Sequence, residues 1–294
     1  MSVKRLKPRR RRLTAGAALS YVLLVAVCAL VLLPIVLTLL YSFFPVSEMT
    51  AYLKTRGNYD QGRWMDLLLS PSVVSLRQYY DLLVEKPVYL QLFFNSVFYT
   101  AVILLGQALF IPMFAFALAK FRFRGRETLF FLILMLMLMP FQVTMAPSVL
   151  TMRFLGLMNT VWAVILPMLF SPFYIFLLRQ YMVGIPGELL EAGMMDGAGA
   201  WRTFVHLVLP VSRPVLGAAV ALSFADTWNM VEQPLIYLSN YSSKLPLSVM
   251  FNQLTTQESG VAFASAALYI APALLIYLYF QEDILLGIQL SDMK

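Results

Sequence analysis

The sequence contains one cysteine, Cys28, and one histidine, His206, among 294 residues. One cysteine cannot form a disulfide within the chain, and a metal site built on thiolates or imidazoles needs several such ligands at fixed spacing. We therefore expect no intramolecular disulfide, no bound metal and no redox chemistry. The sequence also lacks the G-x-x-x-x-G-K-[ST] pattern that cradles nucleotide phosphates. No set of nucleophile, base and orienting residue suggests an enzyme.

Charged residues are scarce as well. They make up 13% of the chain, whereas hydrophobic residues make up 60% and the mean hydropathy is +0.76. Such a composition indicates an integral membrane protein. A membrane-spanning helix needs about 20 apolar residues. Six apolar runs approach or exceed this length: 15–44, 92–119, 128–150, 160–178, 214–238 and 261–287.

Continuous apolar runs predict helices, because the strands of a membrane barrel would alternate between apolar and polar residues. The fold class predicted is therefore an all-α membrane protein with six transmembrane helices. Residues 15–294 are expected to form one domain, preceded by a basic tail over residues 1–14. The first apolar run is too long for the apolar region of a cleaved signal peptide, so we expect it to remain as a span.

The charges that are present are unevenly placed, and their formal sum is +7. Lysines and arginines crowd residues 1–14. A second basic cluster follows the second apolar run and consists of Lys120, Arg122, Arg124 and Arg126. Because cytoplasmic loops carry an excess of Lys and Arg, both termini are predicted to be cytoplasmic, with residues 45–91 outside and residues 179–213 inside. The basic tail is expected to contact anionic lipid, and no nucleic acid.

The cytoplasmic segment 188–210 reads ELLEAGMMDGAGAWRTFVHLVLP. Its first part predicts a short helix over 188–195, and DGAG predicts a turn. A second helix over 200–209 is indicated by apolar residues at helical spacing. The residues alone leave two interpretations open: an amphipathic anchor at the membrane surface, or a ridge presented to a cytosolic partner. The small residues around the turn favour the ridge, because they permit close approach of a partner groove.

The same segment resembles the EAA motif of ABC importer permeases, in which E-A-A is followed by three residues, a glycine, nine residues and I-x-L-P. Residues 191–193, Gly197 and residues 207–210 match this pattern, with Gly193 and Leu207 as conservative departures. AFALAKFRFRGRE and DTWNMVEQPL are similar to segments of carbohydrate permeases of the maltose type. The resemblance extends from about residue 72 to the last residue.

This resemblance implies the type I permease fold and a role in ATP-driven import of a sugar or oligosaccharide by alternating access. It implies four kinds of partner: a second permease subunit, two cytosolic ATPase subunits, an extracellular solute-binding protein and the lipid of a prokaryotic cytoplasmic (inner) membrane. ATP and Mg would be used by the ATPase chains, and this chain would bind no cofactor. The residues implied in coupling to the ATPase are Glu188, Glu191, Ala192, Gly193, Asp196, Gly197 and Ala198.

Two acidic residues, Asp226 and Glu232, interrupt the fifth apolar run. Charges inside a membrane cost about 2.5 to 3.5 kcal/mol on insertion scales, so these side chains are expected to face protein or water. Asp226, Asn229 and Gln233 would share one stripe of a continuous helix, and the Trp228 ring could stack on a sugar. We predict that these five residues line the translocation pathway. The alternative is that the carboxylates bond to neighbouring helices or lie near the outer end of the span.

A rival function also follows from these carboxylates. The chain could work alone as a secondary transporter or channel in which Asp226 and Glu232 are ion or proton sites. In the family pattern, Glu232 and Gln233 stand where an aliphatic and an aromatic residue are commoner, so the solute is left open.

Overall fold

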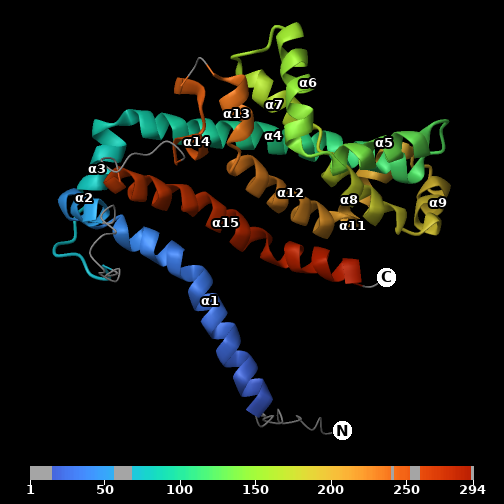
Figure 1. The fold of residues 1–294 in the computed structure, drawn as a ribbon. Helices are drawn as coiled ribbons and strands as arrows, with labels where there is room; N and C mark the ends of the chain where they lie inside the picture. The colour runs from blue at the N-terminus through green and yellow to red at the C-terminus, as the bar shows by residue number, and fades with distance from the viewer. Residues whose placement is uncertain (1–14, 56–67, 240–241, 252–258, 293–294) are drawn as a thin grey trace.

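The computed structural model describes residues 15–55, 68–239, 242–251 and 259–292 (Figure 1). Within these ranges the chain is helical and contains no strand. The first elements are α1 (Ala15–Tyr41), α2 (Val46–Thr55), α3 (Arg77–Tyr80), η2 (Asp81–Glu85) and α4 (Pro87–Lys120). They are followed by α5 (Arg126–Leu138), α6 (Phe141–Phe154), α7 (Val161–Leu169), α8 (Pro172–Val183) and α9 (Gly187–Met195). Next come α10 (Ala200–Thr203), η3 (Phe204–Val208), α11 (Leu209–Val211) and α12 (Arg213–Trp228). The last are α13 (Glu232–Tyr237), η4 (Ser242–Lys244), α14 (Leu247–Phe251) and α15 (Ser259–Asp292).

Four helical stretches of the described chain are long and apolar enough to cross a membrane: Leu19–Tyr41, Pro87–Lys120, Val161–Val183 and Gly260–Leu285. Two bent pairs of helices bring the number to six if each pair is one span: α5 with α6, and α10–α11 with α12. The all-helical membrane fold predicted from the apolar runs is thereby confirmed. The basic tail, 1–14, lies outside the described residues.

The third apolar run does not form one straight helix. α5 ends at Leu138, α6 begins at Phe141, and the two axes are bent by 109°. Pro140 lies at the bend, where it lacks an N–H for a helical hydrogen bond and disfavours helical angles in the residue before it. Met139 accordingly has extended backbone angles, with φ −77° and ψ 124°.

The fifth apolar run is interrupted too, which corrects the single helix expected over 214–238. α12 ends at Trp228, and α13 follows after a break. Pro234 cannot donate a backbone hydrogen bond to the carbonyl of Met230, four residues before it. The Ser248 hydroxyl donates to that carbonyl instead. The chain can therefore turn here without an unsatisfied buried carbonyl.

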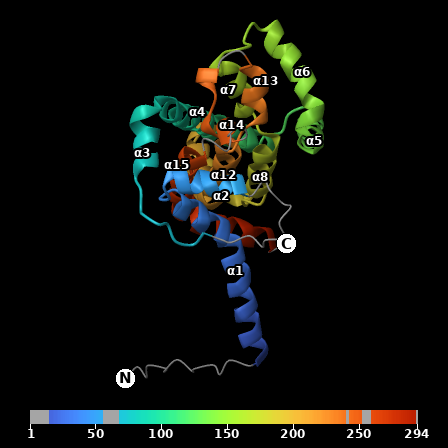
Figure 2. The same cartoon turned by 60° about the vertical axis from the view of Figure 1, so that its left-hand side comes forward.

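Helices α4, α12 and α15 form the long body of the molecule, and α12 packs against both of the others (Figure 1). Gly217 permits the close approach of α12 to α15, because an added Cβ would lie 2.7 Å from the Cβ of Asp283. α1 diverges from this body in both Figure 1 and Figure 2, and the apolar window of its span is 0% buried. α9 lies at one end of the body, and α2 and α3 lie at the other (Figure 1).

The long segment 45–91 contains more helix than the sequence indicates. The stretch VVSLRQYYDLLVEK, whose apolar spacing is typical of a short amphipathic helix, contains α3, which continues as the π-helical η2. α2 was not foreseen, and residues 56–67 lie outside the described part. α2 and α3 both pack against α15 at the end of the molecule opposite α9.

Candidate functional site

Residues 188–210 fold as a helix, a turn and a second helical stretch, as the sequence predicts. The helix α9 follows Pro186 and ends at Met195. The second stretch begins with α10 and continues through η3 into α11, ending at Val211. Its π-helical part reflects Pro210, which has no N–H to donate. The Leu209 N–H just before it bonds to the carbonyl of Phe204, five residues back.

Gly197 closes α9 in a left-handed conformation, with φ +77°. The Ala198 N–H donates to the Gly193 carbonyl at 2.9 Å, and the Gly197 N–H donates to the Met194 carbonyl at 3.0 Å. This pair of bonds is the Schellman motif, which requires positive φ at the residue where Gly197 stands. Glycine adopts that conformation without a steric penalty, which explains why the motif has a glycine at this position.

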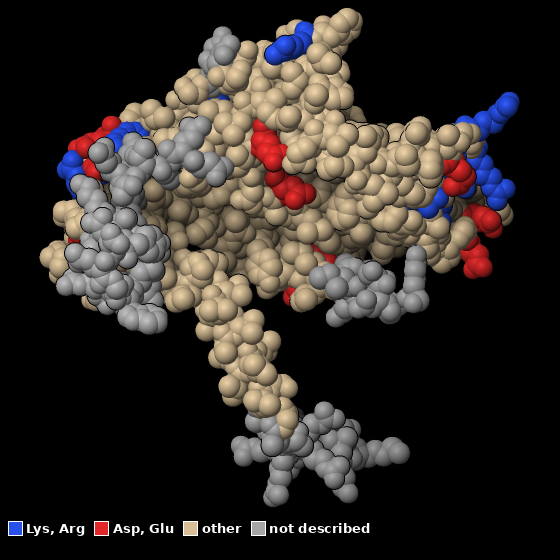
Figure 3. All heavy atoms as spheres, in the orientation of Figure 1, with Lys and Arg blue, Asp and Glu red and all other residues tan. Residues whose placement is uncertain are grey.

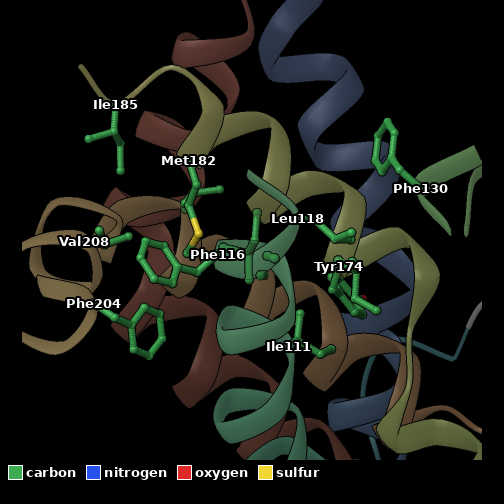
Figure 4. Packing of buried hydrophobic residues seen from close by; sticks show 14 of the residues in the cluster. Ile111, Phe116, Leu118, Phe130, Tyr174, Met182, Ile185, Phe204 and Val208 are labelled. Atoms are coloured by element: carbon green, nitrogen blue, oxygen red, sulfur yellow. The ribbon is translucent and has the colours of Figure 1, made fainter. Parts of the chain in front are cut away.

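The buried side of the segment is attached to the largest apolar cluster of the described chain. Leu190, Phe204 and Val208 are buried there together with residues of α4 and α8. Figure 4 shows Phe204 and Val208 directed toward Phe116 of α4 and Met182 of α8. The Phe116 and Phe204 rings lie 5.1 Å apart between centroids. Movement of α9 and η3 would therefore be transmitted to two membrane-spanning helices through packed side chains.

The opposite side of the segment is exposed. The exposed residues among those implied in coupling are Glu188, Glu191, Ala192, Asp196 and Gly197. Gly193 is buried and Ala198 is half-buried. Met194 and Met195 add apolar surface, at 63% and 89% exposure. The structure thus brings five of the seven residues to the surface at the end of the molecule, with an apolar and acidic character that suits a partner groove.

The two departures from the family motif compensate each other. A Cβ added at Gly193 would lie 2.8 Å from Cδ1 of Leu207. The leucine side chain therefore occupies the space that the second alanine of the motif would need. The packing therefore joins the two departures in one exchange of side-chain shape, since leucine and isoleucine have the same volume.

This exchange predicts a coupled effect. Gly193→Val is expected to force α9 away from η3 at a cost of about 1–3 kcal/mol, the range for overpacked sites. The double variant Gly193→Val with Leu207→Ala should recover most of that loss. Thermal unfolding of the detergent-solubilised protein measures both. Gly187→Val is the matched control, because nothing lies within 4 Å of a Cβ at Gly187. Equal destabilisation by Gly187→Val would contradict the packing explanation.

Basic residues gather at the same end as α9. Figure 3 shows Lys and Arg atoms around the end of the molecule where α5 and α9 lie, together with acidic atoms. Lys120, the last residue of α4, donates to the carbonyl of Ile185 at 2.7 Å and so ties α4 to the start of the 188–210 segment. Arg179 lies over the Phe130 ring at 3.9 Å from its centroid. These contacts join α4, α5 and α8 beside α9.

The polar residues of the fifth run form a second group, midway along the molecule. Asp226 is exposed, and its carboxylate accepts a hydrogen bond from the Tyr174 hydroxyl of α8 at 2.6 Å. Glu232 is exposed and lies 3.4 Å from the amide nitrogen of Gln142 in α6. Asn229, also exposed, donates to the Ala225 carbonyl at 2.9 Å. Figure 3 shows the acidic atoms on an otherwise uncharged surface near the junction of α12 and α13.

Two details of the expected pathway stripe are corrected. Gln233 does not continue the stripe of Asp226 and Asn229, because the helix breaks before it. Trp228 is only 2% exposed, so its ring is not available to stack on a sugar in this structure. It stacks on Phe224 and Tyr269 and donates its indole N–H to the Tyr269 carbonyl at 3.2 Å. Trp228 therefore holds α12 against α15.

Sequence reasoning missed the partners of these polar groups. Tyr174 is buried on α8 and orients Asp226. Gln107 of α4 accepts from the Ser223 hydroxyl of α12 and donates to the Met168 carbonyl at 2.6 Å. A polar residue inside an apolar run indicates a side chain that needs a hydrogen-bond partner. The sequence does not indicate which other helix supplies that partner.

Comparisons with known proteins agree with the motif. Residues 108–282 match the family described as "Binding-protein-dependent transport system inner membrane component". The chain is 33% identical over 275 residues to the arabinooligosaccharides transport system permease protein AraQ of Bacillus subtilis (strain 168), covering 90% of this chain and 91% of that protein. Its identity to the protein of the same name from Halalkalibacterium halodurans is 30% over 231 residues, with 78% and 82% covered.

A solved structure has the same fold. It is described as the crystal structure of a bacterial ABC transporter involved in the import of the acidic polysaccharide alginate, with a TM-score of 0.75, 24% identity, and coverage of 90% of this chain and 95% of that chain. Together with the family match, this places the chain in a transport complex with other subunits. The chain belongs to the family of inner membrane components of binding-protein-dependent transport systems, and is a non-enzymatic permease subunit.

Proposed function

We propose that this chain is one of two dissimilar permease subunits of an ATP-driven importer for a sugar or oligosaccharide. A solute-binding protein outside the membrane would deliver the solute, and two cytosolic ATPase chains would use ATP and Mg. The names of the relatives, which include an arabinooligosaccharide permease and an alginate importer, support a carbohydrate solute. Family membership does not favour the stand-alone transporter or channel based on Asp226 and Glu232.

The observation that carries the proposal is the construction of the α9 segment. Its exposed face carries Glu188, Glu191 and the methionines, and its buried face packs on α4 and α8. We assign Glu188, Glu191, Ala192, Asp196 and Gly197 to contact with an ATPase subunit, and Gly193 and Ala198 to the support of that surface. Closure of the ATPase pair would push α9, and the packed aromatic contacts would pass the displacement to the spans.

The energy required for such coupling is moderate. Moving a two-state equilibrium from 1:99 to 99:1 needs roughly 5.5 kcal/mol of differential binding. Closure of the two ATPase chains around ATP would supply this difference, and the packed connection from α9 would carry it to the spans. α1, whose span is 0% buried in this chain, provides apolar surface for lipid and for the second permease subunit.

The exposed polar group at the α12–α13 junction is our candidate for the pathway. Asp226, Asn229, Glu232 and the half-buried Gln233 present carboxylate and amide groups that pair with hydroxyl groups of a sugar. The Tyr174 hydrogen bond holds Asp226 in place. Trp228 supports this surface from behind by packing, and we do not assign it to direct solute contact.

Co-purification tests the proposal. When the permease pair and its ATPase are expressed together, a tag on this chain should retain the ATPase subunits, and Glu191→Lys should reduce the retained ATPase at least tenfold. A reversed charge at a docking surface costs several kcal/mol when it faces a like or unpaired group. Glu282→Lys is the control, because Glu282 is an exposed carboxylate on α15, outside the α9 segment. Solute transport in proteoliposomes that contain only this chain would contradict the proposal.

A further inference from the structure

The loop between α4 and α5 lies beside two hollows of opposite character. One has a volume of about 340 Å³ and carries a net positive charge; its lining consists of Arg122, Phe123, Gly125, Arg126, Glu127 and Thr128. The second has a volume of about 290 Å³ and is lined by apolar residues only, including Phe121 and Trp201. Residues that line the two hollows are in contact, because Arg122 follows Phe121 and the Arg126 guanidinium donates to the Phe121 carbonyl at 3.3 Å.

Arg122, which lines the basic hollow, and Arg124, which lies between the lining residues Phe123 and Gly125, are not neutralised within the described chain. Arg126 is paired with Glu127 at 2.5 Å, and the same carboxylate lies 4.0 Å from Arg179. Arg122 and Arg124 are exposed, and neither forms an ion pair with a described residue. Two guanidinium groups are therefore available to an anion, and guanidinium pairs with phosphate through parallel hydrogen bonds.

The apolar hollow is built from aromatic rings of two separate segments. Phe116 and Phe121 come from the end of α4, and their centroids lie 5.3 Å apart. Trp201 and Phe204 come from α10 and η3, and their centroids lie 5.6 Å apart. Phe121 and Trp201 are 43% and 62% exposed. An occupant of this hollow would touch α4 and the helix that follows the α9 turn at the same time.

The position of the loop matches the boundary of a membrane. The span of α4 ends at Lys120, and α5 begins at Arg126. Exposed aromatic residues beside basic ones are typical of the membrane–water interface. Figure 3 shows Lys and Arg atoms at this end, interspersed with Asp and Glu atoms, and the same end carries α9. The charge distribution predicts that this is the cytoplasmic end.

We propose that these two hollows form a binding site for one anionic phospholipid of the cytoplasmic leaflet. Its phosphate would be held by Arg122 and Arg124, and one acyl chain would lie along Phe116, Phe121 and Trp201. The combination of free cations and an apolar hollow fits an amphiphile, whereas a soluble anion would leave the aromatic hollow unfilled. The lipid would bridge the α4–α5 loop and α10, and so stabilise the segment that carries α9.

Lipid binding to the purified transporter tests the site. Native mass spectrometry would compare phosphatidylglycerol with phosphatidylcholine of the same acyl chains. The double variant Arg122→Gln with Arg124→Gln should weaken phosphatidylglycerol binding about thirtyfold, because each cation near an anionic headgroup contributes about 1 kcal/mol. Phosphatidylcholine, whose ammonium group offsets the charge of its phosphate, should bind the unchanged protein more weakly and lose less affinity in the double variant. Trp201→Ala should weaken both lipids. Arg153→Gln is the control, because Arg153 is an exposed arginine at the far end of α6.

Three outcomes would overturn the proposal: no loss of phosphatidylglycerol in the double variant, the same loss in Arg153→Gln, or equal binding of the two lipids by the unchanged protein. Displacement by soluble glycerol 3-phosphate at equal concentration would also overturn it, since the site would then hold a phosphate without a lipid. Both arginines are exposed, so the melting temperature of the double variant should equal that of the unchanged protein. If it does not, the single variants Arg122→Gln and Arg124→Gln, each expected to lose about fivefold, decide the question.

Discussion

Gly197→Val is expected to abolish ATP-driven transport while the permease remains inserted in the membrane. Gly197 has φ +77° at the end of α9, and a β-branched residue is strongly disfavoured there. The strain is about 1–3 kcal/mol. The Schellman bonds from Ala198 and Gly197 would be lost first, because they depend on this conformation. The docking face of α9 would then be displaced, and we expect retention of the ATPase by a tag on this chain to fall at least tenfold.

Two further variants separate backbone strain from side-chain volume. Gly199→Val is the matched control: Gly199 is two residues away, nothing lies within 4 Å of an added Cβ, and its extended backbone (φ −68°, ψ 168°) accepts any residue. Its transport should stay within about twofold of the unchanged protein, since strain-free surface changes have small effects. Gly197→Asn should be intermediate, because asparagine tolerates the left-handed region. If Gly199→Val were as damaging as Gly197→Val, volume rather than backbone conformation would matter.

Trp228→Ala should produce the largest loss of stability among single substitutions in the α12–α13 region. Trp228 is 2% exposed and stacks on Phe224 and on Tyr269, with the latter centroid 4.9 Å away. We expect the free energy of unfolding to fall by about 3 kcal/mol, the lower end of the range for aromatic-to-alanine changes in protein cores. The lower end applies because apolar side chains gain less from burial when the alternative environment is lipid and not water. The melting temperature of the solubilised protein should fall by roughly 6 °C. Since α12 and α15 would loosen, solute transport should fall as well.

A second tryptophan provides the comparison. Trp162 of α7 is 49% exposed, so Trp162→Ala removes the same side chain from a site with fewer protein contacts. Its melting temperature should change by a small fraction of the shift in Trp228→Ala. A Trp228→Phe variant keeps a stacked ring but loses the indole hydrogen bond, and should lie between the two. Unchanged stability in Trp228→Ala would mean that the ring is not a packing element and would reopen its assignment to the pathway.

The 188–210 segment shows which structural features can be predicted from local sequence. The turn and the second helix were predicted from local features: the glycine-containing DGAG sequence, in which Gly197 has positive φ, and the apolar spacing in the second stretch. Local chemistry of this kind can be read along the chain. The compensation between Gly193 and Leu207 could not, because it depends on a contact across the turn.

The intramembrane polar residues show the opposite case. Their presence in an apolar run indicates that they need partners, but Tyr174, Gln142 and Tyr269 come from helices remote in the sequence. Trp228 illustrates the same point: from sequence, a tryptophan beside polar residues looks alike whether its ring faces a pathway or packs against a neighbouring helix, as the ring does here. The break after α12 also depends on Ser248 of α14, because its hydroxyl donates a hydrogen bond to the Met230 carbonyl.

The sequence by itself determined that this chain is a helical membrane protein, which end of each span is basic, and which segment forms the α9 turn. These properties follow from apolar run length, charge placement and the backbone preferences of glycine and proline, all of which act locally. Only the tertiary structure decided that the third run bends by 109°, that Trp228 is buried, and that residues of the α4–α5 loop line both a basic and an apolar hollow. The physical reason is that neighbouring helices supply the packing contacts and the hydrogen-bond partners. The apolar pattern of one helix does not specify which other helices lie beside it.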